Sequence, residues 1–144
     1  MGDLIDLDDL SEDEDSNVLN SEIDKANKEI KEKINKTAFL RITPVSGEEE
    51  AKAIFENQQK AASAFIDFIF NMNDRTYRSR LCVVSYDMGF PILIKSLIDT
   101  GEENIAESIR ITDSKADLHK NLKLILNSKH MKRLYIMAKK ESIE

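Results

Sequence analysis

Residues 62–86, ASAFIDFIFNMNDRTYRSRLCVVSY, decide whether this chain is all-helical or contains a sheet. The first half continues an apolar pattern that begins at Ala51 and has the spacing of one helical face. Residues 71–74 break that pattern. The second half is rich in β-branched residues, and its short apolar run fits either a helix or a strand. We favour a helix over residues 75–86, with helix and strand both open for residues 79–86.

The helix predicted upstream of this break begins after Ser46, which can act as its cap with Glu49 as the capping-box partner. Three phenylalanines, Phe65, Phe68 and Phe70, make its apolar face wider than that of an ordinary surface helix. One interpretation is a central core helix. The other is an oligomer interface formed by these three side chains.

The segments on either side also predict helices. In residues 17–36 the apolar side chains recur at steps of three and four, at Leu19, Ile23, Ala26, Ile30 and Ile34. That stripe is narrow, so we expect it to pack on the body or on another chain. Residues 37–45 predict a short extended connector, and further helices are expected over residues 91–99, 102–111 and in two segments after residue 112.

The predicted fold class is therefore all-α, a compact bundle of about five or six helices. We expect three parts: a mobile acidic arm over residues 1–16, an amphipathic helix over residues 17–36, and a helical domain over residues 37–144 with basic C-terminal helices.

Charge is distributed unevenly along the chain. The first 24 residues hold ten acids and no Lys or Arg, whereas residues 25–144 hold the other 17 acids and all 21 basic residues. Such an acidic arm is typical of disorder. Its sequence LIDLD suits a docking peptide, with Leu4, Ile5, Leu7, Asp8 and Asp9 as partner-binding residues, and resembles the short box that binds the terminal domain of clathrin.

Two basic segments suit nucleic acid. Arg75, Arg78 and Arg80 surround Tyr77, a combination that can contact phosphate and stack on a base. Residues 115–140 carry eight basic side chains against one acid, with Lys120, Lys123, Lys132 and Arg133 as the candidate contacts. The alternatives are a solvated surface, or a surface on which the acidic arm folds back.

No pattern in the chain predicts catalysis. The four glycines form no phosphate-binding loop, and neither His119 nor His130 has metal ligands at the spacing of a zinc site. The single cysteine, Cys82, lies in an apolar run and predicts a buried thiol in a reducing compartment. We expect no enzyme activity, cofactor, metal or membrane partner, and a cytoplasmic location.

The order of an acidic arm, a helical hairpin with a basic break at residues 75–80 and a charged tail is similar to that of the small terminase subunits of tailed phages. The resemblance implies a ring-forming protein that handles DNA. From the residues themselves we expect a non-enzymatic helical adaptor or assembly protein that docks protein partners through its acidic arm and forms an oligomer. The alternative is a nucleic-acid-binding accessory protein that uses residues 75–80 and 115–140, for example in phage DNA packaging, replication or transcription.

Overall fold

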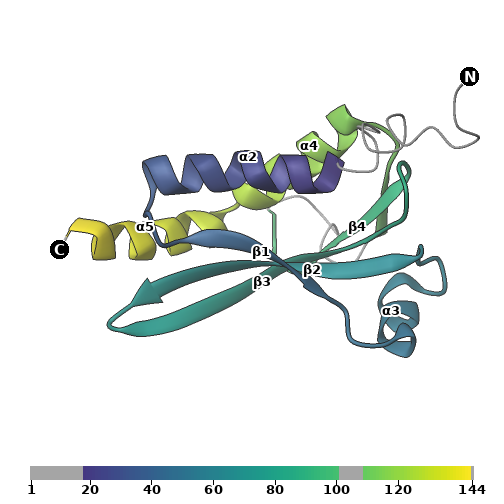
Figure 1. Cartoon of the computed structure of the whole chain (residues 1–144), viewed down its shortest axis with the longest axis horizontal. Helices are drawn as coiled ribbons and strands as arrows, with labels where there is room; N and C mark the ends of the chain where they lie inside the picture. The colour runs from purple at the N-terminus through teal and green to yellow at the C-terminus, as the bar shows by residue number, and fades with distance from the viewer. Residues whose placement is uncertain (1–17, 101–108, 144) are drawn as a thin grey trace, which may run out of the picture.

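The computed structural model describes residues 18–100 and 109–143, which form a five-stranded antiparallel sheet with helices on both faces (Figure 1). The strands are β1 (Phe39–Pro44), β2 (Ala62–Met72), β3 (Arg75–Tyr86), β4 (Ile92–Ser96) and β5 (Ile109–Thr112). The helices are α2 (Val18–Lys33), α3 (Glu48–Phe55), α4 (Lys115–Leu126) and α5 (Lys129–Ile143). None of these helices is long and apolar enough to cross a membrane.

The strands are hydrogen-bonded in sequence order, from β1 at one edge to β5 at the other. Helices α2, α4 and α5 cover one face, and α3 lies against the opposite face near one end (Figure 1). Most buried side chains lie between the three helices and the sheet, including Ile66, Phe68 and Leu81. A smaller cluster, which includes Phe55, Phe65 and Val83, lies under α3. Each helix buries one apolar stripe against the sheet.

The all-helical prediction is wrong, because the segment that decides the fold is a β-hairpin. Strand β2 pairs with β3 along its whole length. The two strands are joined by Asn73 and Asp74, both with positive φ, 54° and 61°. Two consecutive residues of this conformation form the type of turn that matches the twist of an antiparallel hairpin, and Asn and Asp adopt it more easily than most residues.

Burial explains why β2 resembled a helix in the sequence. Residues 64–70 of this strand are all buried, because α5 and other helices cover one face and α3 and its neighbours cover the other. A strand that is buried on both faces has no alternation of apolar and polar residues.

Helix α3 ends at Phe55, and the chain leaves it through Glu56 and Asn57, which both have positive φ.

Other predicted elements also change. The predicted helix over residues 91–99 contains strand β4, and residues 109–112 of the next predicted helix form β5, whereas residues 101–108 lie outside the described part of the chain. The capping role predicted for Ser46 is also wrong, since Gly47 is the N-cap of α3 and the helix has no side-chain cap. The helix expected within residues 17–36 is present as α2, and the two helices expected after residue 112 are present as α4 and α5.

Candidate functional site

A groove lies between α2 on one side and α4 with the start of α5 on the other. Its volume is about 600 Å³. We call it the helix groove. Its apolar surface comes from Ile23, Ala26, Ile30, Ile34, Leu122, Leu126 and Tyr135. Ile23, Ile30 and Leu122 are buried, whereas the others are partly exposed and therefore available to a ligand.

Tyr135 is held rigidly at the α5 side of the groove. Its hydroxyl donates a hydrogen bond of 2.8 Å to the carbonyl of Leu126, and its ring packs edge-on against Phe68 with 5.6 Å between centroids. Burial, and to a smaller extent the negative charge of Glu29, raises the pKa of Tyr135 to about 12. Tyr135 is therefore neutral at physiological pH and contributes an aromatic surface to the groove.

Helix α2, which forms the other wall, is fixed by two asparagines. The side chain of Asn27 donates to the carbonyl of Leu40 and accepts from its amide, at 3.1 and 2.6 Å, which ties α2 to strand β1. The buried Asn35 donates to the carbonyl of Ala138 in α5 at 2.8 Å. Because both contacts use backbone groups of other elements, they hold α2 and the residues that follow it against β1 and α5.

One end of the groove is bridged by a contact between a histidine and a glutamate. The Nδ1 atom of His119 in α4 lies 2.8 Å from Oε2 of Glu22 in α2. Glu22 is buried, and its other oxygen lies 3.7 Å from Nζ of Lys25. The carboxylate of Glu22 is thus already engaged by two basic side chains of the protein.

The rim of the groove is mainly basic. Four exposed lysines line it, Lys25 and Lys33 from α2, Lys123 from α4 and Lys132 from α5. Glu29 is the exposed acid among its lining residues. An apolar hollow with cationic edges suits a ligand that has apolar groups and negative charges close together.

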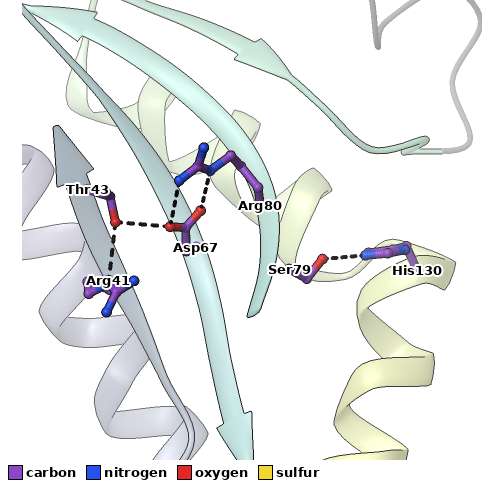
Figure 2. Close-up of polar contacts among 6 residues, drawn as sticks. All are labelled: Arg41, Thr43, Asp67, Ser79, Arg80 and His130. Carbon is purple, nitrogen blue, oxygen red and sulfur yellow. Dashed lines mark hydrogen bonds and ion pairs between the residues drawn. The ribbon is translucent and has the colours of Figure 1, made fainter. Parts of the chain in front are cut away.

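A second polar cluster lies on the opposite face of the sheet, and its centre is the fully buried Asp67 in β2 (Figure 2). The carboxylate accepts hydrogen bonds from Nε of Arg80 at 3.0 Å and from the hydroxyl of Thr43 at 3.0 Å. Arg41 in turn donates to that hydroxyl at 3.3 Å. The guanidinium of Arg80 also lies 3.9 Å from the centroid of the Phe65 ring.

A bulge brings this pair together. The register between β2 and β3 shifts between Ile66 and Asp67, so that Arg80 lies opposite Asp67 and Leu81 has no partner across the ladder. Without the extra residue, an apolar side chain would face the buried carboxylate. We interpret the cluster as structural, because each hydrogen bond to Asp67 comes from a neighbouring strand of the same sheet.

Figure 2 also shows a serine–histidine contact, in which Oγ of Ser79 lies 2.8 Å from Nε2 of His130. It links β3 to α5. A catalytic pair of this kind needs a third group that orients the imidazole. Among the described residues no such group contacts His130, and neither side chain lines the helix groove. The described part of the chain also holds no cluster of three or more side chains suited to a metal ion.

The structure separates the residues of the predicted arginine–tyrosine site. Side chains alternate between the two faces along β3. Arg78 and Arg80 therefore lie on the face that carries Asp67, whereas Arg75 and Tyr77 lie on the face covered by α2, α4 and α5. Tyr77 packs against Phe70 with 5.6 Å between ring centroids, and Arg80 is occupied by Asp67. These four side chains do not form one surface.

The other predicted site residues fall into three groups. Lys120, Lys123, Lys132 and Arg133 are all exposed on α4 and α5, but only Lys123 and Lys132 line the groove. Phe65, Phe68 and Phe70, the predicted oligomer interface, are at most 7% exposed and belong to the core of a single chain. The predicted partner-binding residues, Leu4, Ile5, Leu7, Asp8 and Asp9, lie outside the described residues.

The groove has no signal of its own in the amino-acid sequence. The stripe in residues 17–36 included Ile23, Ala26, Ile30 and Ile34, and it predicted a face that packs on the body or on another chain; in the structure it packs on the body. It gave no sign that this face is only partly covered, because the gap depends on how α2 is placed relative to α4 and α5. Comparison of the chain with models of protein families, with curated proteins and with solved structures found no match.

Proposed function

We propose that the protein is a non-enzymatic adaptor that binds a short segment of a protein partner in the helix groove. The segment carries a few apolar anchors, which fill the hollow, and Asp or Glu residues, which meet the lysines of the rim. The observation that supports this proposal is the combination of a partly exposed apolar surface with four exposed lysines on both sides of it. Binding of an amphipathic segment to a groove between helices is a common mode of peptide recognition.

The geometry favours a ligand that adapts to a fixed site. Asn27 and Asn35 hold α2 in place, and the Glu22–His119 contact links α2 to α4. A preformed groove loses little conformational entropy on binding, so most of the cost of ordering falls on the peptide. We therefore expect affinities in the micromolar range, on the order of 10 µM, for a segment of about ten residues.

A peptide-display selection against the immobilised full-length protein tests the proposal. We expect the selected sequences to share two or three apolar residues and at least two acids. Their affinity should fall about tenfold or more in the variant Lys123→Glu, which reverses a charge on the rim. The matched control is Lys120→Glu, which makes the same charge change on the same helix outside the groove. Selected peptides that bind both variants as well as the natural protein would contradict the groove as the binding site.

A nucleic-acid-binding accessory protein is the second candidate function, and the exposure of Lys120, Lys123, Lys132 and Arg133 on neighbouring helices supports it. Phosphate contacts act through charge and depend little on the shape of a groove. Lys120→Glu and Lys123→Glu should then weaken the binding of a labelled oligonucleotide equally. The affinity should also fall steeply between 50 and 200 mM salt, by about tenfold for every two phosphate contacts in the complex. The absence of binding at low salt would exclude this candidate.

A further inference from the structure

The sequence contains one segment with the composition that the helix groove suits. Residues 4–10, LIDLDDL, combine four apolar side chains with three aspartates. The groove offers an apolar surface flanked by four exposed lysines, and its buried acid, Glu22, is already engaged by His119 and Lys25. Ligand and site are therefore complementary in both apolar character and charge.

The connection to α2 is long enough for this segment to reach the groove. Helix α2 begins at Val18 and is about 24 Å long, given a rise of 1.5 Å per residue, and its part from Glu22 onward forms one wall of the groove. Residues 11–17, SEDEDSN, contain no apolar side chain, and seven residues span up to about 24 Å when extended. The chain can thus fold back before Val18, so that residues 4–10 reach any part of the wall that α2 forms.

We propose that residues 4–10 of the chain occupy its own helix groove and compete there with a partner segment. This inference rests on the proposed function of the groove, to which it adds an internal competitor. The same seven residues then serve to keep the site closed until a partner with higher affinity displaces them. An attached segment competes through its high effective concentration, even when its intrinsic affinity is low.

The test uses the full-length chain and a fluorescent peptide that copies residues 1–16 as the probe. A leader variant carries Leu4→Ser, Ile5→Ser and Leu7→Ser, which removes apolar anchors and keeps every charge. We expect the probe to bind the leader variant about tenfold more tightly than the natural chain, because an attached arm acts at about 1 mM against a free-peptide Kd of about 100 µM. Adding Lys123→Glu to the leader variant should lower the affinity of the probe by a similar factor, whereas adding Lys120→Glu should leave it unchanged.

The outcomes separate the two proposals. The probe could bind the natural chain and the leader variant equally and still lose affinity when Lys123→Glu is added. That result would overturn occupation of the groove by the chain's own segment, but it would leave the groove as a peptide-binding site. If instead the display-selected peptides bind Lys123→Glu as tightly as the natural chain, the groove is not the peptide-binding site.

Zero-length carbodiimide cross-linking of the monomeric full-length chain gives a second readout. We expect the acids of residues 4–10 to be linked preferentially to Lys25, Lys33, Lys123 and Lys132, and these links to be lost in the leader variant. Equal yields at Lys120 and at Lys60, which is outside the groove, would mean that the arm is attracted only by overall charge, and would overturn the proposal.

Discussion

Replacing Arg80 by methionine should destabilise the protein more than neutralising the aspartate with which it pairs. The Asp67 side chain is completely buried, whereas 33% of the Arg80 side chain is exposed. Arg80→Met removes the guanidinium, which donates to Asp67 at 3.0 and 3.5 Å, and leaves a buried carboxylate with the hydroxyl of Thr43 as its remaining hydrogen-bond donor. Breaking a buried pair from one side costs about 3–5 kcal/mol.

The magnitudes differ because only one partner can reach water. We expect Arg80→Met to cost about 3 kcal/mol, at the lower end of that range, because methionine still packs on Phe65 and water can approach the vacated, partly exposed position. Asp67→Asn keeps an acceptor for Thr43 and leaves a guanidinium that can turn toward solvent, so we expect about 1–2 kcal/mol. In the double variant no buried charge remains, and its cost should be close to that of Asp67→Asn alone.

Urea unfolding of the three full-length variants, followed by circular dichroism, measures these free energies. In thermal unfolding Arg80→Met should lower Tm by about 10 °C for a chain of this size. The matched control is Arg78→Met, the next residue of β3 on the same face, which is exposed and should change stability by less than about 0.5 kcal/mol. If Arg80→Met and Arg78→Met have the same effect, or if the costs of the two single changes simply add, the assigned role of the buried carboxylate is wrong.

Three further predictions concern other parts of the fold. Asn35→Ala removes hydrogen bonds to Ala138 and Thr37, and we expect it to lower the free energy of unfolding by about 2 kcal/mol in urea titration. Burial, and secondarily the charge of Asp67, raises the pKa of Cys82 from 9.0 to about 12. Between about pH 9 and pH 12 the thiol therefore ionises in the unfolded chain and stays protonated in the folded chain. This difference leaves the free energy of unfolding unchanged below about pH 9 and lowers it as the pH rises toward 12. Urea unfolding across that range should therefore show a steeper decline for the natural chain than for Cys82→Ala, and equal slopes would contradict the assignment. Asp74 has a φ of 61°, a conformation that glycine adopts without steric cost and valine does not. Asp74→Gly should therefore raise the free energy of unfolding by about 0.5–1 kcal/mol, and with it Tm, whereas Asp74→Val should lower both.

Helices α2, α4 and α5 were predictable because each shows one local pattern. Helix α2 has a single apolar stripe with a period close to 3.6, and in α4 the N-cap Ser114 accepts a hydrogen bond from the amide of Asp117. In both cases the side chains face one buried surface, so period and burial agree. The sheet offered no such agreement, since β2 is buried on both sides and lacks the alternation that marks a half-buried strand.

The turn between β2 and β3 shows where a better prediction was within reach. Asn73 and Asp74 are residue types that tolerate positive φ, and they lie between two segments rich in Phe, Ile and Val, which together are the signature of a hairpin. The bulge that places Arg80 opposite Asp67 has no comparable local signal. The helix groove has none either, because it depends on the placement of α2 relative to α4 and α5, helices that are distant from it in the sequence.

The most direct test of the helix groove as the binding site is an amide NMR titration of the isotope-labelled full-length leader variant with the peptide of residues 1–16. Binding in the groove predicts chemical-shift changes concentrated at residues of α2, α4 and α5 that line it, namely Ile23, Ala26, Ile30, Leu122 and Leu126. It also predicts little change at Arg41 and Arg78 on the opposite face of the sheet. Shifts centred on that face, or no shifts at millimolar peptide, on the order of ten times the expected Kd, would contradict it.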